Sequence, residues 1–242
     1  MSNILEVQNA TKKFGGLMAN EDITFNVGYG EIVGIVGPNG AGKTTLFNSI
    51  SGEHALTSGK VIFDGNDVTG LKAHKICKLG IGRTFQIPKP LDAMTVLENV
   101  LVGALCRTDD MIAAREKAKE VVEICGLKKN QDMTVGNMNV IQKKRVEIAR
   151  ALATDPKLIL LDETMAGLTN TERKEAVELI RTINGRGISI LTIEHVMDVV
   201  MKVSNRVVVI NSGKLLVEGT PEEVTSNEKV IEAYLGGGKH AS

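Results

Sequence analysis

The sequence of 242 residues contains few cysteines, no excess of either charge and no long apolar run. Its three cysteines, Cys77, Cys106 and Cys125, form no CxxC pair, so we expect reduced thiols rather than a disulfide framework or a zinc knuckle. The 29 lysines and arginines balance 29 aspartates and glutamates, which excludes a global positive field that would draw the protein onto nucleic acid.

Long apolar segments are missing as well. The apolar runs at residues 158–161 and 207–210 are far shorter than the roughly 18 residues that span a bilayer. The first residues lack the basic segment and apolar stretch of a secretory signal. We therefore expect a globular protein without a transmembrane helix of its own, located in the cytoplasm.

Short β-rich runs alternate with longer helical patterns, which is typical of an α/β protein with a mostly parallel sheet. Residues 4–10, 23–27 and 60–68 instead predict antiparallel strands beside that sheet. Strand signals fade between about 91 and 153. We predict a single domain over 1–242, in which the α/β core and an antiparallel β-subdomain span 1–90 and 154–242, and an inserted helical subdomain spans 91–153.

Capping signals place several helices. Thr95 with Glu98 and Thr169 with Glu172 each form a capping box that opens a helix. The segment 111–127 is amphipathic and stops at Gly126. One last helix is predicted from Thr220 to about residue 235, followed by a flexible tail.

A glycine-rich loop carries the strongest chemical signal. Residues 37–44 fit GxxxxGK[ST] between a buried strand (31–37) and a helix (43–52), which predicts a nucleoside triphosphate ligand. Glycines let backbone N–H groups converge on phosphate oxygens, Lys43 reaches the outer phosphates, and the Thr44 hydroxyl can ligate Mg²⁺. The candidate nucleotide-binding residues here are Gly37, Pro38, Asn39, Gly40, Ala41, Gly42, Lys43, Thr44 and Thr45.

Two acidic residues follow the buried strand at 158–161. Asp162 and Glu163 stand at its carboxyl end, where ligands of α/β proteins bind. We predict that Asp162 holds Mg²⁺ and that Glu163 is the general base for the attacking water. Solvated acids at a strand end are the plain alternative, and the complete phosphate loop makes it less favoured.

The order of these motifs resembles that of the ATP-binding cassette (ABC) ATPases, over nearly the whole chain. GRTFQ at 82–86 is similar to the family's Q-loop, which implies that Gln86 acts in catalysis and near the metal. His195, after Glu194, is similar to the switch histidine at the γ-phosphate, and Phe14 is similar to the aromatic residue that stacks on adenine. The resemblance implies a P-loop NTPase core, ATP and Mg²⁺ as cofactors, the metal residues Thr44, Gln86 and Asp162, and the catalytic residues Lys43, Gln86, Glu163 and His195.

Longer phrases are similar to those of the ATPase subunits of branched-chain (hydrophobic) amino acid importers. They include GIGRTFQIPKPLDAMTVLENVLVG, TIEHVMDVV and EGTPEEVTSNEKVIEAYLG. The resemblance implies ATP hydrolysis that powers amino acid import. Urea importers and lipopolysaccharide-export ATPases carry similar phrases, so they stay open as alternatives.

The family signature LSGGQ is altered here to the stretch 138–142, MNVIQ. Asn139 can still cap the following helix and donate a hydrogen bond, and with Gln142 it is a candidate nucleotide contact. Val140 and Ile141 replace both glycines, and their β-branched side chains crowd a backbone that should lie against phosphate. One lost contact of this kind costs about 2.7 to 4 kcal/mol in the transition state.

A second departure is Thr164, where the family usually has proline; we expect it to loosen the loop that follows. Two functions are therefore compatible with the sequence. The chain is either a working ATPase or a nucleotide-binding switch with little hydrolysis at the altered signature.

The resemblance also implies partners. We expect transmembrane permease subunits that dock around residues 85–105, a second ABC ATPase subunit in a homodimer or heterodimer and, indirectly, a solute-binding protein. The chain would then lie peripherally on the inner face of the cell membrane. No nucleic acid partner is expected, because the basic clusters are short. The sequence has no NKxD element of a GTPase and no long coiled coil of a repair ATPase.

Overall fold

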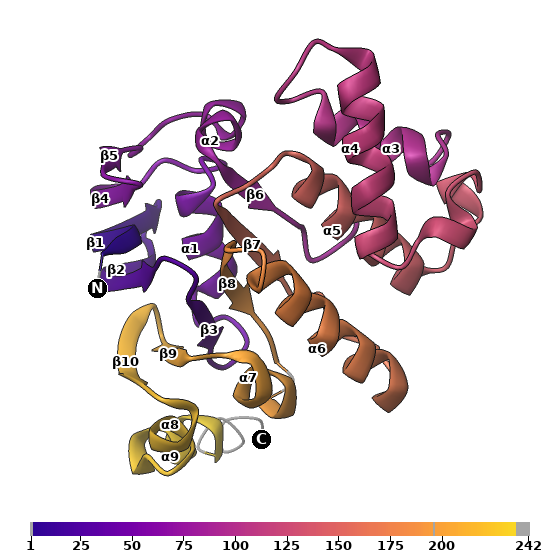
Figure 1. The fold of residues 1–242 in the computed structure, drawn as a ribbon. Coiled ribbons are helices and arrows are strands. Elements are labelled where there is room, and N and C mark those ends of the chain that lie inside the picture. The colour runs from indigo at the N-terminus through magenta and orange to yellow at the C-terminus, as the bar shows by residue number, and fades with distance from the viewer. Residues whose placement is uncertain (1, 196, 236–242) are drawn as a thin grey trace.

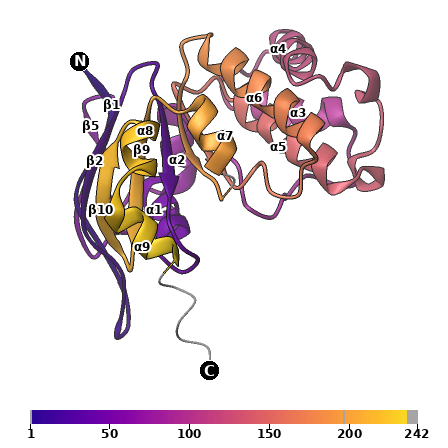
Figure 2. The same ribbon diagram turned by 90° about the horizontal axis from the view of Figure 1, so that it is seen from below.

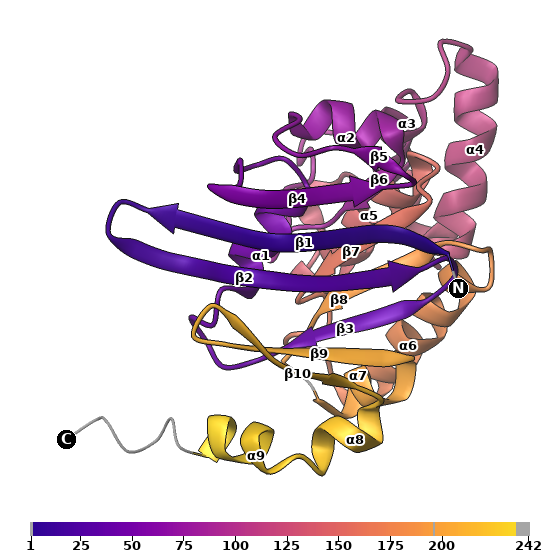
Figure 3. The same ribbon diagram turned by 90° about the vertical axis from the view of Figure 1, so that its left-hand side faces the viewer.

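The computed structural model describes residues 2–195 and 197–235. Two long strands and two shorter ones form an antiparallel sheet in the order β2-β1-β4-β5 (Figure 3). Its members are β1 (Asn3–Phe14), β2 (Leu17–Gly28), β4 (Ser58–Phe63) and β5 (Asn66–Asp67). The predicted antiparallel strands are therefore present, and the first two are longer than predicted because their pairing continues to the tip of the hairpin.

The second sheet has the order β10-β9-β3-β8-β7-β6 and is parallel except for β10, which pairs antiparallel with β9. Every residue of β3, β7 and β8 is buried, as expected for parallel strands that are covered on both faces. The strands are β3 (Ile32–Val36), β6 (Ile81–Arg83), β7 (Leu158–Asp162), β8 (Ser189–Ile193), β9 (Arg206–Asn211) and β10 (Lys214–Gly219).

Alternate residues of β7 separate two apolar cores. Leu158 and Leu160 pack with the antiparallel sheet and with α1 (Lys43–Ile50) on one face of the parallel sheet. Ile159 and Leu161 pack with the helices on the other face. Figure 1 shows these layers in order, with the antiparallel sheet on one side and the helices on the other.

The structure describes all of residues 84–157. They form helices and contain no strand of either sheet. The elements are α3 (Val96–Ala104), α4 (Met111–Ile124), the short 3₁₀ turns η1 (Lys128–Asn130) and η2 (Val135–Asn137), and α5 (Val140–Ala153). In Figure 2, α3, α4 and α5 gather beside α6 (Asn170–Asn184), away from the antiparallel sheet. The predicted α/β fold with an antiparallel sheet and an inserted helical region is confirmed, and the boundaries at 91 and 153 stay a prediction.

The capping boxes predicted at Thr95 and Thr169 are both formed. The single last helix is wrong, because the chain forms α8 (Pro221–Thr225) and α9 (Glu228–Leu235). Asn227 breaks the helix: its side chain accepts a hydrogen bond from the Lys229 amide and caps a new start. The predicted tail, 236–242, lies outside the described residues.

Elements without a counterpart in the sequence predictions include α2 (Ala73–Leu79), α7 (Met197–Val203) and the strands β6 and β10. Within the described part of the chain, no helix has the length and apolar character needed to cross a membrane.

Candidate nucleotide-binding site

The glycine-rich loop connects β3 to α1 and depends on glycine at two close approaches. A Cβ at Gly37 would meet the Ile210 carbonyl oxygen at 2.0 Å, and one at Gly42, where φ is +98°, would meet the Ala19 oxygen at 2.3 Å. Asn39, at the tip of the loop, is exposed. The neighbouring β-strands thus force the backbone into an open turn at the start of a helix, which is the geometry that receives phosphate.

Lys43 lies inside this turn. Its side chain is buried, and Nζ donates to the carbonyl oxygens of Gly37 at 2.7 Å and Pro38 at 2.9 Å. Burial lowers the pKa of Lys43, while the nearby carboxylates of Glu163 and Asp162 act to raise it. Because its present partners are neutral carbonyls, the ammonium is well placed to exchange them for anionic phosphate oxygens.

Asp162 ends β7 as a buried acid without a hydrogen bond. Its exposed fraction is 1%, and neither carboxylate oxygen has a hydrogen-bond partner. The nearest cation is Arg83, with Nη2 3.6 Å from Oδ2. Burial raises the pKa of Asp162, although Arg83 acts to lower it. A buried carboxylate with free oxygens fits a divalent cation, and Thr44 in the first turn of α1 supplies a hydroxyl of the kind that Mg²⁺ accepts.

Two predicted catalytic side chains, Gln86 and His195, meet the carboxylate of a third, Glu163, which directly follows Asp162. The Gln86 amide donates to Oε2 of Glu163 at 2.7 Å, and Nε2 of His195 lies 2.7 Å from Oε1. They follow β6, β7 and β8, three neighbouring parallel strands, so their carboxyl ends bring distant segments to one place. Two hydrogen bonds fix the direction of the Glu163 carboxylate, and each oxygen keeps a further lone pair for a water.

Buried charges hold the backbone of the loop that begins at Glu163, where φ is +49°. Lys144 of α5 donates to the carbonyl oxygens of Glu163 at 2.9 Å and Ala166 at 3.0 Å. Oε1 of Glu194 accepts from the Met165 amide at 3.0 Å and from the Thr164 hydroxyl at 3.1 Å. Thr164, which we expected to loosen this loop, therefore adds a hydrogen bond that proline could not make.

These two buried charges also perturb each other. Burial raises the pKa of Glu194 to about 7, and Lys144 acts to lower it. Burial lowers the pKa of Lys144, and Glu194 is the first of three acids that act to raise it. The pair is thus electrostatically matched inside the protein, next to the residue predicted to be the general base.

One face of α5 reaches the Q-loop as well. Glu147, one turn after Lys144, is 2% exposed and accepts hydrogen bonds from the amides of Phe85 at 3.1 Å and Lys89 at 3.2 Å. Burial raises the pKa of Glu147. A single helix therefore orients both the segment that carries Gln86 and the loop that carries Glu163.

Sequence reasoning missed the side chains that hold the site in place. Arg83 donates to Asn48 Oδ1 at 2.6 Å and to Ser51 Oγ at 2.5 Å, which links the Q-loop to α1. For Lys144 the available signal was a charged residue within the apolar pattern of a helix. For Glu194 it was an acid directly after the apolar strand at 189–193.

Phe14 lies at the end of β1 and is 43% exposed, so it is not an ordinary core residue. His54 meets its ring edge to face at 5.5 Å, and the Lys12 ammonium lies 4.8 Å from its centroid. An exposed aromatic ring is suited to stack on a base. The adenine contact stays a prediction.

The altered signature begins α5. Asn139 is the N-cap: its side chain accepts from the Gln142 amide at 2.8 Å, and the Gln142 side chain accepts from the Asn139 amide at 3.2 Å. The predicted cap is confirmed. Among the described residues each of these two side chains bonds to the backbone amide of the other residue and not to the phosphate loop. Val140 is 63% exposed, so the start of α5 faces outward.

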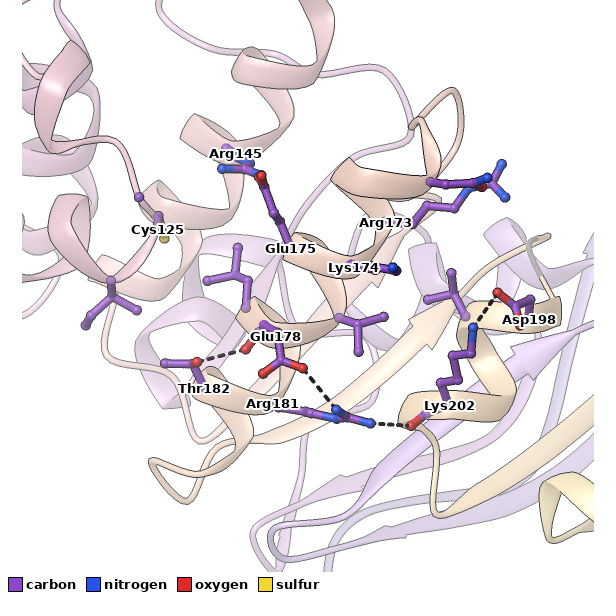
Figure 4. A pocket seen from close by; sticks show the side chains of 16 residues that line it. Cys125, Arg145, Arg173, Lys174, Glu175, Glu178, Arg181, Thr182, Asp198 and Lys202 are labelled. Atoms are coloured by element: carbon purple, nitrogen blue, oxygen red, sulfur yellow. Dashed lines mark hydrogen bonds and ion pairs between the residues drawn. The ribbon is translucent and has the colours of Figure 1, made fainter.

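An open hollow of about 1090 Å³ lies elsewhere, between α6, α7 and the adjoining ends of α4 and α5 (Figure 4). Charged side chains line it, and several are paired within it. Arg181 bonds to Glu178, Lys202 to Asp198 and Arg145 to Glu175. Two further cations, Arg173 and Lys174, also line the hollow, but no residue of the glycine-rich loop does.

Comparisons with known proteins agree with this geometry. Residues 20–166 match the family described as ABC transporter, and residues 214–240 match the one described as branched-chain amino acid ATP-binding cassette transporter. The chain is 38% identical to the probable branched-chain amino acid transport ATP-binding protein LivG of Archaeoglobus fulgidus, over 96% of this chain and 95% of that protein. It is 37% identical to the high-affinity branched-chain amino acid transport ATP-binding protein BraF of Pseudomonas aeruginosa, over 96% and 98%.

Solved structures are similar over nearly the whole chain. A crystal structure of the ADP conformation of an ATP-binding cassette of an ABC transporter superposes with a TM-score of 0.88 at 34% identity, covering 98% of this chain and 100% of that one. A dimeric ATP-binding cassette in a post-hydrolysis state, bound to ADP and phosphate, gives 0.82 at 26% identity, covering 90% and 98%.

Proposed function

The chain belongs to the family of ABC transporter ATP-binding proteins, and we propose that it binds and hydrolyses ATP to power the import of branched-chain or other hydrophobic amino acids. The observation that carries the proposal is the meeting of Gln86 and His195 on the Glu163 carboxylate, beside a buried Asp162 and an open phosphate loop.

The residues divide the chemistry among them. Backbone amides at the start of α1 and the Lys43 ammonium bind the phosphates. Thr44 and Asp162 would hold Mg²⁺, with Gln86 as a further candidate ligand, and the cation would supply charge stabilisation at the phosphate oxygens. Glu163 accepts the proton of the attacking water, and Gln86 and His195 keep its carboxylate aimed.

The proposed class of transported solute is inferred from the similar proteins. Both relatives described above carry names that refer to branched-chain amino acid transport, and neither refers to urea or lipopolysaccharide. The transported solute need not contact this chain, because permease subunits form the path across the membrane and a solute-binding protein delivers the solute. These partners place the chain at the inner face of the membrane.

The permease contact is best supported within 86–95. Ile87 is 74% exposed and Leu91 is 40% exposed, which gives this segment an apolar surface without a core role. From Val96 onward, α3 turns most of its apolar side chains into the helical core, with Val102 as an exposed exception. The docking segment is therefore the first half of the predicted 85–105. A permease helix on it would also touch the residues held by Glu147.

Ile87→Asp tests this contact. Co-purification with the permease subunits should fall at least about tenfold, because a charge would be buried against an apolar partner. Ile112→Asp is the matched control, since Ile112 is 78% exposed on α4. Equal retention of the permease by both variants would place docking elsewhere.

A second subunit completes the proposed ATPase. The start of α5 is exposed and bears the signature position, so it can face the nucleotide of a partner copy or of a related subunit. The second candidate function is a nucleotide-dependent switch with little hydrolysis. The observation that favours it is that the capping box occupies both Asn139 and Gln142.

The rate of MgATP hydrolysis per subunit, measured against protein concentration, separates the two functions. A dimeric ATPase should show a rate that rises with concentration and disappears in Glu163→Gln, which keeps the size of the side chain and one acceptor oxygen but loses the base. Glu178→Gln, an exposed acid on α6, is the control. A rate equal to that of Glu163→Gln at every concentration, with ATP bound, would leave the switch as the function.

A further inference from the structure

Two of the three cysteines lie side by side although they belong to different parts of the chain. The Sγ atoms of Cys77, on α2, and Cys106, just after α3, are 3.8 Å apart. Both are free thiols and partly exposed. In the described residues no group of three or more His, Cys, Asp and Glu side chains gathers to bind a metal, so these thiols form a pair rather than part of a metal centre.

The backbone around the pair is held firmly. Arg107 donates to the carbonyl oxygens of Lys78 and Thr154, both at 2.5 Å, and to that of Cys77 at 3.3 Å. This guanidinium joins the end of α2, the turn after α3 and the end of α5. The two sulfur atoms are therefore kept close by neighbouring contacts, and only a further approach of about 1.7 Å separates them from bonding distance.

A small oxidant can reach the pair. Cys77 is among the residues that line a cavity of about 210 Å³, several times the volume of a water molecule. Cys125 offers the opposite case within the same chain. It is 2% exposed, and burial raises the pKa of its thiol to about 12. Burial and the neighbouring Cys106 raise the pKa of Cys77 as well, so access is what favours oxidation at the pair over oxidation at Cys125.

We propose that Cys77 and Cys106 are an oxidative modification site, at which a peroxide converts the two thiols into a disulfide that joins the α/β core to the helical segment. In the first step one sulfur attacks the peroxide, the O–O bond breaks, and a sulfenic acid and water form. In the second step the other sulfur attacks the sulfenic sulfur, the S–S bond forms, and a second water leaves. Two thiols and one hydrogen peroxide thus give one disulfide and two waters.

The bond would enclose residues 78–105. This loop contains Arg83 and Gln86 and all of the segment proposed for permease docking. Its ends lie on α2 of the core and after α3 of the helical segment, so oxidation fixes the distance between these two parts of the protein. The modification concerns the chain's own thiols and does not depend on the proposed transport function.

The experiment treats the full-length reduced protein with hydrogen peroxide, blocks remaining thiols, and maps peptides by mass spectrometry without reduction. We expect a linked peptide pair containing Cys77 and Cys106, the loss of two free thiols per chain, and reversal by dithiothreitol. Cys125 should stay reduced. Separate sulfinic or sulfonic acids at the two positions, or a link between two chains, would overturn the proposal.

Thermal unfolding gives a readout of the geometry. The oxidised wild-type protein should melt roughly 5 °C or more above the reduced protein, because a disulfide between well-placed residues restricts the unfolded chain. Cys77→Ser and Cys106→Ser should lose the shift, and Cys125→Ala should keep it. A linked protein that melts no higher than the reduced one would mean that the bond strains the fold, contrary to the placement of the two thiols.

Discussion

Two short segments near α5, residues 162–166 and residues 138–142, differ in the hydrogen bonds that fix them and in their exposure. The proposed catalytic loop, residues 162–166, is fixed by buried side chains from two places, Lys144 of α5 and Glu194 after β8, which bond to its backbone. The signature segment, residues 138–142, has side-chain hydrogen bonds only within its own capping box among the described residues, and Val140 projects 63% exposed. Buried hydrogen bonds thus tie the segment of the proposed general base to the rest of the chain, whereas the altered signature segment presents an exposed side chain at Val140.

This difference indicates which contacts are changed by the departure of residues 138–142 from the family signature. Lys144 stands only two residues after Gln142, so α5 carries the altered signature and the support of the proposed general base, Glu163, on consecutive turns. A change in the signature segment can therefore alter contacts to a second subunit without disturbing the nucleotide cradle of this chain. The predictions below separate these two roles of α5.

Lys144→Met should have the largest effect, because it removes the link between α5 and the catalytic loop. Two hydrogen bonds from a charged donor are lost, each worth about 1.5 kcal/mol or more, so the free energy of unfolding should fall by about 3 kcal/mol. Urea unfolding measures this loss. Hydrolysis should fall in parallel, since the backbone that aims Glu163 is released.

Lys143→Met is the matched control for that variant. The neighbouring Lys143 pairs with the exposed Asp92 at 2.9 Å, a surface interaction worth less than about 1 kcal/mol. Equal losses from the two variants would show that the contacts of Lys144 with the catalytic loop contribute nothing special.

Glu194 should make stability depend on pH. Its pKa is raised from 4.5 to about 7 in the folded protein, so between these values the folded state binds a proton that the unfolded state has released. Stability from this group is therefore complete below pH 4.5, falls as the pH rises towards 7 and is constant above it. From pH 5 to 7 the loss should be roughly 2 kcal/mol.

Urea unfolding of wild type and Glu194→Gln at several pH values isolates this contribution. The glutamine oxygen can still accept from Met165, and the other acids with raised pKa values, Asp162 and Glu147, are present in both proteins. The wild-type curve should slope more steeply between pH 5 and 7. Parallel curves would contradict the raised pKa.

The same contrast explains what could be predicted from sequence. Lys43, Asp162 and Glu163 follow from local pattern, because a strand, its end and the next helix are adjacent in the chain. Gln86 and His195 follow from the order of motifs. Lys144 and Glu194 could not be inferred, since their partners are 19 to 30 residues away and depend on how α5 and β8 pack on the catalytic loop.

The fold shows a similar limit. Strands buried on both faces, such as β7, are visible as continuous apolar runs. β10 has only partly buried or exposed residues. Its antiparallel pairing with β9 depends on tertiary contacts and cannot be predicted from the local sequence pattern. At the break between α8 and α9, the Asn227 side chain accepts a hydrogen bond from the Lys229 amide, and this local bond competes with continuation of the helix.

Restoring glycine in the signature segment tests directly whether Val140 and Ile141 limit ATP hydrolysis. Val140→Gly combined with Ile141→Gly should raise hydrolysis per subunit by about tenfold, because phosphate of a partner's nucleotide could approach the start of α5. Val102→Gly is the control: Val102 is 43% exposed on α3, where glycine lowers helix stability without touching the signature segment. An unchanged rate in the double variant would show that the β-branched residues do not limit turnover.

Two substitutions of Asn139 separate its role as the N-cap of α5 from a role in contacting the nucleotide of a partner subunit, and we expect the smallest effects here. Asn139→Ala removes the cap of α5 and should cost about 1 kcal/mol, a fall of roughly 2–4 °C in Tm, as Thr95→Ala should at the capping box of α3. Asn139→Asp keeps the cap, because aspartate accepts the same hydrogen bond and suits the helix N-terminus. Its negative charge would nevertheless repel phosphate on a partner subunit, so Tm should stay near that of wild type while hydrolysis falls. If Asn139→Asp hydrolyses ATP as fast as wild type, Asn139 serves only the helix, and the signature segment makes no contact with nucleotide through this side chain.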